Sequence, residues 1–176
     1  ATVFHMNEGH AAFAALERVR RFVARGSDMK SAIRQVRASS VFTTHTPVPA
    51  GNDRFDATLT LKYIGSYAKA LGINNQELLA SGREDESDKN EPYCMTVLAL
   101  KLSRHCNGVA ALHGDTSRRM WTKMYGLTAD AHAKVPIGSI TNGIHSETWL
   151  APEMRAVYDK YLKPKWNGAG PKDDWW

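Results

Sequence analysis

The sequence predicts an α/β fold, a Rossmann-like parallel sheet with helices packed on it. Residues 1–6 and 40–44 have the β-branched and aromatic composition that is typical of strands. Between them, residues 9–36 carry apolar side chains at the three-and-four spacing of helices. A strand, two helices and a second strand in this order predict a parallel pair, because parallel strands need a long crossover connection.

Two helices are predicted inside this crossover. Residues 9–25 present one apolar face, and Gly26 follows as a helix stop. Ser27 is the expected N-terminal cap of a second, shorter helix over residues 29–36.

The rest of the chain alternates between loops and helices. Residues 46–55 predict a loop, because Pro47, Pro49 and Gly51 interrupt any regular period. Further helices are predicted at 56–71, 74–81, 95–105, 108–125 and 152–162, with a charged surface loop at 83–91 and a strand at 135–141.

Composition narrows the classes of protein that fit. The 176 residues are 43% hydrophobic, which suits one ordinary soluble domain. The net charge of +5 comes from interleaved basic and acidic residues without a basic run, so nucleic acid is not a predicted partner. Two cysteines are too few for a disulfide framework or a zinc cluster. No apolar stretch is long enough to span a membrane and no signal peptide is visible, so we expect a cytoplasmic protein.

The two ends of the chain predict a longer parent protein. The first residue is not Met, and strand-like residues begin at once. Trp166, Trp175 and Trp176 lie close to the other end, and we expect such exposed apolar surface to support self-association.

Three polar turns follow predicted strands and define the candidate site. Glu8 and His10 follow the first strand, His45 follows the second, and Asn142 follows the last. The carboxyl ends of parallel strands share one edge of a sheet, where ligands bind. Carboxylate, imidazole and amide groups suit a neutral polyol such as a sugar, which is oriented by hydrogen bonds.

Glu8 has two interpretations that are compatible with each other, as a carboxylate at a helix N-terminus and as a substrate contact. A zinc site is not predicted, because His5 and His10 are five residues apart across a turn rather than four apart on a helix. No Gly-x-Ser-x-Gly motif and no Cys–His arrangement supports a nucleophile. Arg118 and Arg119 suit either a phosphate contact or a solvated helix face, and we favour the solvated face.

Four segments in one order carry a resemblance to a known family. They are HMNEGHAAFAALERVR, VFTTHTPVPAGNDRF, MTVLALKLSRHCNGVAALHG and IGSITNGIHSETWLAPEM. At these segments the chain resembles the α-glucan (glycogen or maltodextrin) phosphorylases, specifically their bacterial and archaeal branch. The animal-type enzymes have Asp where this chain has Glu8.

The resemblance implies a role in the retaining phosphorolysis of α-1,4-glucan to glucose 1-phosphate, with glucan and phosphate as partners. Residues 1–145 then correspond to the end of the N-terminal domain of a GT-B glycosyltransferase, and residues 146–176 lead toward the C-terminal domain. His45 and Asn142 match residues that hold the glucosyl unit through its 6-hydroxyl, His45 also through its backbone carbonyl. Glu8 matches an acidic residue that lines the same cleft.

The family's cofactor, pyridoxal phosphate, is expected in the parent enzyme, but no lysine here stands in a segment that resembles its binding site. The family's Gly-rich phosphate loop and its downstream Arg and Lys cluster are also not found, so no complete catalytic set is predicted and the chain alone should be inactive. The alternative is a free-standing, non-catalytic module that binds glucan or a protein partner. The sequence suits glycogen and maltodextrin equally.

Overall fold

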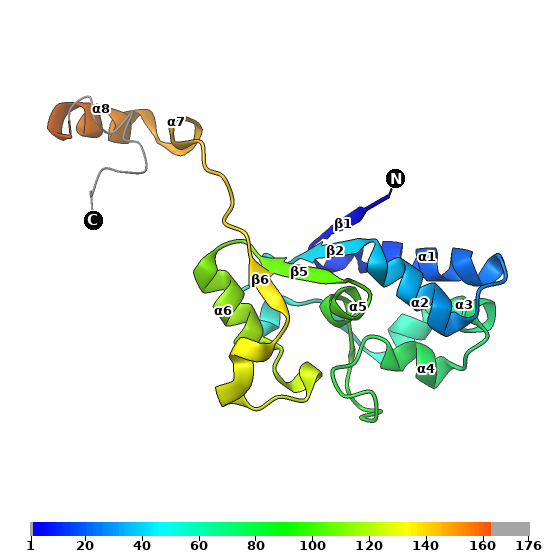
Figure 1. The fold of residues 1–176 in the computed structure, drawn as a ribbon. Coiled ribbons are helices and arrows are strands. Elements are labelled where there is room, and N and C mark those ends of the chain that lie inside the picture. Colours follow the sequence, from blue (N-terminus) through cyan, green and yellow to red (C-terminus); the bar gives the residue numbers. More distant parts are fainter. Residues whose placement is uncertain (1, 163–176) are drawn as a thin grey trace. The chain divides into compact units, whose positions relative to one another are not determined.

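A four-stranded parallel sheet lies at the centre of the fold (Figure 1). The structure is a computed structural model, and it describes residues 2–162. The strands lie in the order β1 (Phe4–Asn7), β2 (Ser40–Thr43), β5 (His105–Gly108) and β6 (Ile137–Ser139), all parallel. Two short strands, β3 (Arg54–Phe55) and β4 (Tyr93–Cys94), form a separate antiparallel pair. The predicted α/β class with a parallel sheet is confirmed.

The helices follow the predicted apolar periods closely. After the 3₁₀ turn η1 (Gly9–Ala11) come α1 (Ala12–Ala24), α2 (Met29–Ala38), η2 (Pro49–Gly51), α3 (Ala57–Leu71), α4 (Asn75–Ala80), α5 (Met95–Lys101), α6 (Ala111–Met120), η3 (Lys123–Tyr125) and η4 (Ala129–Lys134). The cap of α2 is Asp28 and not Ser27, because the Asp28 carboxylate accepts from the backbone N–H of Ser31 at 2.9 Å.

The central strand β5 is the main error of the sequence prediction. A helix was expected over residues 95–105, but α5 ends at Lys101 and residues 105–108 are a strand. His105–Gly108 contains no β-branched or aromatic strand former, and it is a strand because β2 and β6 pair with it on both sides. The helix predicted over residues 108–125 is therefore shorter, and the predicted loop at 46–55 includes η2 and β3.

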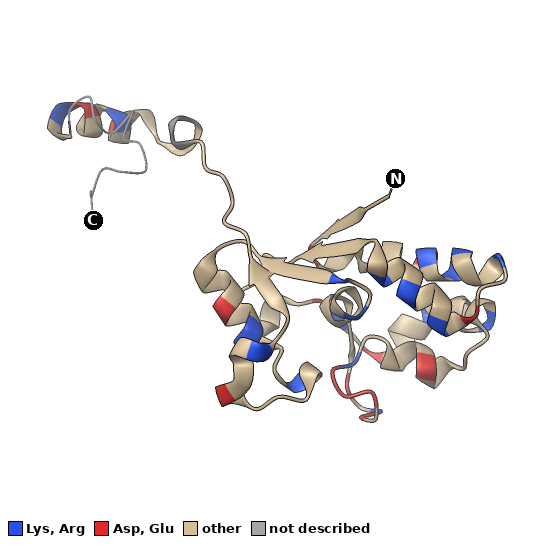
Figure 2. Ribbon diagram, in the orientation of Figure 1, with Lys and Arg blue, Asp and Glu red and all other residues tan. Residues whose placement is uncertain are grey.

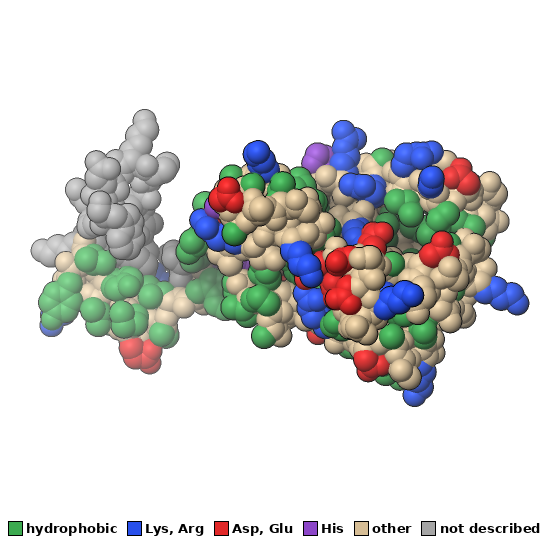
Figure 3. Space-filling model, turned by 90° about the horizontal axis from the view of Figure 1, so that it is seen from below, with side chains coloured by type: hydrophobic (Ala, Val, Ile, Leu, Met, Phe, Trp, Pro, Cys, Tyr) green, Lys and Arg blue, Asp and Glu red, His purple; other side chains and the backbone are tan. Residues whose placement is uncertain are grey.

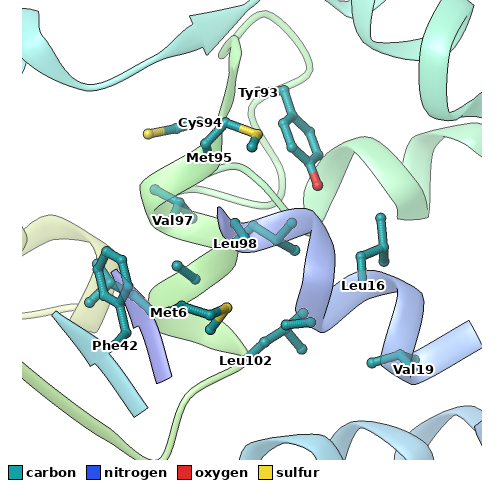
Figure 4. Packing of buried hydrophobic residues seen from close by; sticks show 14 of the residues in the cluster. Met6, Leu16, Val19, Phe42, Tyr93, Cys94, Met95, Val97, Leu98 and Leu102 are labelled. Carbon is teal, nitrogen blue, oxygen red and sulfur yellow. The ribbon is translucent and has the colours of Figure 1, made fainter. Parts of the chain in front are cut away.

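The core surrounds α5. Every residue from 95 to 100 is buried and all but Thr96 are apolar, so this helix lies inside the domain. Figure 4 shows Met6 and Phe42 from the strands and Leu16 from α1 around the helix α5, which carries Val97 and Leu98. This short helix thus packs against both the sheet and the first helix.

Charged side chains lie mostly on the outside. Lys and Arg residues line α1 and α2, and acidic residues gather in the loop between α4 and β4 (Figure 2). On the face shown in Figure 3, both signs are interspersed. The charged loop was predicted at the surface, but Arg83 within it is buried and donates to the carbonyls of Lys89 and Glu91 at 3.0 Å each.

The chain divides into two compact units, residues 1–142 and residues 143–176. The second contains α7 (Ser146–Trp149) and α8 (Pro152–Tyr161), the latter with Pro152 in its first turn. Trp166, Trp175 and Trp176, on which the expected self-association rests, lie outside the described residues. Across residues 2–162, no helix combines the length and apolar character needed to cross a membrane.

Candidate functional site

The candidate site lies at the carboxyl ends of the four parallel strands. We call this edge the rim, defined as residues 8–10, 44–46, 107–110 and 140–142. Backbone hydrogen bonds continue past the strands and tie these segments together: Thr44 to Asn107, Ile140 to Gly108, and Asn142 to Val109, each 3.0 Å from N to O. The rim is therefore an extension of the sheet and not a set of loose loops.

Glu8 organises the first half of the rim. Its carboxylate accepts three hydrogen bonds, from the N–H of Gly9 at 2.9 Å, the N–H of His45 at 2.6 Å and the hydroxyl of Thr46 at 3.1 Å. Its own N–H donates to the Thr43 carbonyl at 2.9 Å. The interpretation of Glu8 as a helix N-terminal carboxylate is confirmed, since it caps η1, and the same group also holds the backbone of His45.

The backbone of Glu8 is strained. Its φ of 71° and ψ of 163° make it the one non-glycine residue with positive φ among residues 2–162. This region of φ and ψ is populated almost entirely by glycine, and a larger residue costs about 1–3 kcal/mol there. Such strain persists where the surroundings over-determine it, and it concentrates at functional sites. The three bonds to the carboxylate are the surroundings that hold it here.

The loop after His45 is anchored at its far end. Asn52, which is buried, donates to the carbonyl of Val48 at 3.2 Å and accepts from the hydroxyl of Thr96 at 2.8 Å. Thr96 lies in the first turn of α5, so the loop is fastened to the core. A Cβ at Gly9 would lie 2.7 Å from the same hydroxyl, which leaves no room for a side chain at residue 9.

His45 and Asn142 offer exposed side chains on this fixed backbone. Glu8 and His45 are in direct contact, whereas Asn142 is attached through Val109 to the end of β5, the strand next to β2. His10 is also exposed, in η1. An exposed imidazole and an exposed amide on a rigid backbone can orient a hydroxyl-bearing ligand through hydrogen bonds.

Sequence reasoning missed a polar row that supports the rim from within the sheet. The Thr43 hydroxyl donates to the Asn107 side-chain oxygen at 3.0 Å and lies 2.7 Å from His5 Nε2. The Asn107 amide in turn donates to the Gly108 carbonyl at 3.1 Å. Strand β5 was not predicted from the sequence, and only its pairing with β2 places Thr43 next to Asn107.

Comparison with known proteins shows which proteins have similar sequences. The chain is 43% identical over 159 residues to the glycogen phosphorylase of Mycobacterium tuberculosis, and the match covers 86% of the chain and 18% of that protein. The chain is homologous to part of the phosphorylases. The maltodextrin phosphorylase of Thermococcus litoralis is 34% identical over 175 residues, 99% of the chain and 20% of that protein. The glycogen phosphorylase of Aquifex aeolicus is 29% identical over 159 residues, and the match covers 90% of the chain and 22% of that protein.

The resemblance to the glycogen and maltodextrin phosphorylases of bacteria and archaea is thereby confirmed. The chain spans about a fifth of the length of the curated relatives it matches, 18% to 22% for these three. It matches no model of a protein family.

The described lysines of this chain do not fit a pyridoxal phosphate site. Lys101 is the least exposed lysine of those described, and its Nζ is bound to the carbonyls of Ala80 and Arg83 and to the Glu86 carboxylate, at 2.7 to 3.0 Å. The other lysines between residues 2 and 162 are exposed, and none lies in the rim. A Schiff base needs a free amine in an enclosed site, so the described residues do not supply one.

The arginine pair of α6 and the two cysteines do not add a reactive group to the candidate site. Arg118 and Arg119 both pair with Asp115, and the Arg119 guanidinium holds the pKa of the Asp115 carboxyl below its usual range. Burial raises the pKa of the Cys106 thiol to about 12 and also raises the pKa of Cys94, which opposes formation of a reactive thiolate. No group of three or more potential metal ligands occurs within residues 2–162.

A cavity of about 790 Å³ is at the opposite ends of the strands. Arg104 and Cys106 at the start of β5, and Pro136 just before β6, line it together with residues of α1, α2, α4 and α5. None of Glu8, His45 and Asn142 contributes to it. We therefore base the candidate site on the chemistry of the rim and not on cavity size.

Proposed function

We propose that the rim is one wall of the glucosyl-binding site of an α-1,4-glucan phosphorylase, in which glucan and phosphate give glucose 1-phosphate. The observation that carries the proposal is the pairing of a strained Glu8 with the backbone of His45, inside a segment homologous to phosphorylases. A protein retains such strain where a peptide group must be held in one position.

In this proposal the side chains of His45 and Asn142 hydrogen-bond the 6-hydroxyl of the reacting glucose. The backbone carbonyl of His45 faces the sugar ring, where its negative end favours the positive charge that develops at the anomeric carbon. This interaction is stronger in the transition state than in the ground state, which is the condition for catalysis. Glu8 keeps the His45 peptide in place through the 2.6 Å bond.

The described sheet then belongs to the N-terminal Rossmann-like domain of a GT-B enzyme, and the rest of a longer cytoplasmic protein completes the site. Pyridoxal phosphate supplies proton transfer in this family, but the described residues do not hold it and we assign no step to it. The 176 residues alone are therefore inactive. Glycogen and maltodextrin are equally suitable substrates for the residues named.

The first test separates an enzyme segment from a free-standing binding module. The purified 176-residue chain should show no pyridoxal absorption band and no phosphate-dependent release of glucose 1-phosphate. The complete protein encoded around this segment should show both. The proposal would be contradicted if the coding sequence started and stopped at the ends of this chain. It would also be contradicted if the encoded protein bound maltoheptaose but catalysed no phosphorolysis. Either result would favour the module.

The second test concerns His45 and Asn142 in the complete protein. His45→Ala should cost roughly 1–3 kcal/mol, about 5- to 150-fold in kcat/KM, because it removes one side-chain hydrogen bond and leaves the backbone carbonyl. Asn142→Ala should cost a comparable amount, and the double variant less than the sum, since both side chains bind one hydroxyl. His105→Ala, which changes an exposed histidine at the other end of β5, is the control and should retain activity. Strict additivity would contradict the shared hydroxyl.

A further inference from the structure

The connection between β5 and α6 carries the second half of the rim. It consists of residues 108–110. The Gly108 carbonyl accepts from the N–H of Ile140 at 3.0 Å and from the Asn107 amide at 3.1 Å. The Val109 carbonyl accepts from the N–H of Asn142 at 3.0 Å. The position of the Asn142 backbone therefore depends on the position of Val109.

His113 fixes Val109 from the other side. Its Nδ1 lies 3.2 Å from the Val109 nitrogen and accepts the hydrogen bond of that N–H. A backbone N–H can only donate, so Nδ1 carries no proton and the ring is the neutral form protonated on Nε2. Ala110, the N-cap of α6, makes no side-chain capping bond, and His113 in the first turn binds a backbone donor just before the helix instead.

The imidazole is wedged against the backbone. A Cβ at Gly108 would lie 2.5 Å from His113 Nδ1 and 2.9 Å from the Gly114 nitrogen, so only glycine fits beneath the ring. A Cβ at Gly114 would lie 2.9 Å from the Ser139 side chain, so α6 is equally close to β6. The His113 ring therefore lies directly against the backbone beside Val109.

Stability alone does not account for a histidine at this position. The Nε2 atom of His113 is buried and has no hydrogen-bond partner among the described residues. A buried donor without an acceptor is unfavourable, and an apolar or smaller polar side chain would avoid that cost. The bond from Nδ1 to Val109 is the polar interaction that the ring provides.

We infer that His113 is a positioning residue: by binding Val109 it holds the backbone of Asn142 at the rim, as Glu8 holds that of His45. This inference rests on the proposed role of Asn142 as a ligand of the glucosyl unit. His113 itself touches no reacting atom in this scheme. It acts through two hydrogen bonds in series, from the Val109 N–H to its own Nδ1 at 3.2 Å and from the Asn142 N–H to the Val109 carbonyl at 3.0 Å.

The structural arm of the test needs no sugar and uses the 176-residue chain. In the wild type, ¹⁵N shifts of the His113 ring should report an unprotonated Nδ1 and a protonated Nε2. His113→Leu, which fills similar space without an acceptor, should speed amide hydrogen exchange at Val109 and Asn142 by about tenfold, the equivalent of one hydrogen bond. His113→Asn places an oxygen near the former Nδ1 and should restore slow exchange. His105→Leu is the control.

The functional arm uses the complete protein. His113→Leu should lower kcat/KM for glucan phosphorolysis about tenfold, and His113→Asn should recover most of it. Asn142→Ala should have a smaller effect when combined with His113→Leu than in the wild type, because the two residues act through one element. General destabilisation would not produce either the rescue or the coupling.

The outcomes distinguish the inference from the function on which it rests. A protonated Nδ1, or unchanged exchange in His113→Leu, overturns the inference whatever the activity. If His113→Leu does not fold, the ¹⁵N shifts of the wild-type His113 ring and the amide exchange of His113→Asn still test the inference. A large loss from Asn142→Ala with none from His113→Leu overturns the positioning role alone. No loss from either variant overturns the proposed role of Asn142, and the inference with it.

Discussion

The core around α5 and the rim at the strand ends are built from opposite kinds of side chain, although they share one sheet. In the core, residues 95–100 are buried on all sides. At the rim, His45 and Asn142 are exposed and project from a backbone held by Glu8 and, through Val109, by His113. Burial of apolar area stabilises the first region, whereas hydrogen bonds to backbone groups order the second.

The contrast shows how one small domain separates stability from recognition. The rim continues the strands of the core, and specific hydrogen bonds also attach it, such as the bond from Thr96 on α5 to Asn52 in the loop after His45. Exposed rim side chains can therefore change without loss of the fold, while their backbone stays in place. Changes in the core should alter stability first.

The largest expected effect tests the core. Leu98→Ala should lower the free energy of unfolding by about 2–5 kcal/mol, because the residue is 1% exposed and its truncation leaves a cavity. Urea denaturation of the 176-residue chain measures it. The same substitution at Leu112, which is 80% exposed, is the matched control and should change stability by less than about 0.5 kcal/mol. Equal losses at the two sites would contradict the assignment of α5 as the core.

A smaller effect tests the strain at the rim. Glu8→Ala and Glu8→Gly both remove the carboxylate, but only glycine adopts φ 71° and ψ 163° without strain. Glu8→Gly should therefore be more stable than Glu8→Ala by about 1–2 kcal/mol in urea denaturation.

The control for this comparison is Ala14, an exposed residue within α1. There the order should reverse, since glycine in a helix costs about 1 kcal/mol relative to alanine. The same sign at both positions would mean that the backbone of residue 8 is not strained in the folded protein.

The smallest effect lies on the surface of α1 and gives a baseline for both regions. Hydrogen bonds from Arg20, and then from Arg21 and Tyr67, lower the pKa of Glu17 below its usual value of 4.5. A lowered folded-state pKa stabilises the protein above the unfolded-state pKa, and this contribution is lost as the pH falls. Unfolding measured between pH 5.5 and about 3.5 should show stability falling with pH, and less steeply in Glu17→Gln. Tyr67→Phe should give a smaller change of the same sign, and an unchanged slope in both variants would contradict the cause assigned here.

The sequence alone predicted most of the helices and the parallel α/β class. Apolar side chains recur along α1, α3 and α8 at the helical period, and that information is local. Strand β5 could not be predicted in this way, because His105, Cys106 and Asn107 have no strand propensity of their own. Their conformation comes from hydrogen bonds to strands that are distant in the sequence.

The candidate site divides along the same line. The sequence by itself determined that Glu8, His45 and Asn142 each follow a strand, and that their segments resemble those of phosphorylases. Only the tertiary structure decided that the Glu8 carboxylate binds the His45 backbone 37 residues away, and that His113 supports Asn142 through Val109. The physical reason is that hydrogen-bond partners are chosen by the register of parallel strands, which depends on the packing of the whole sheet.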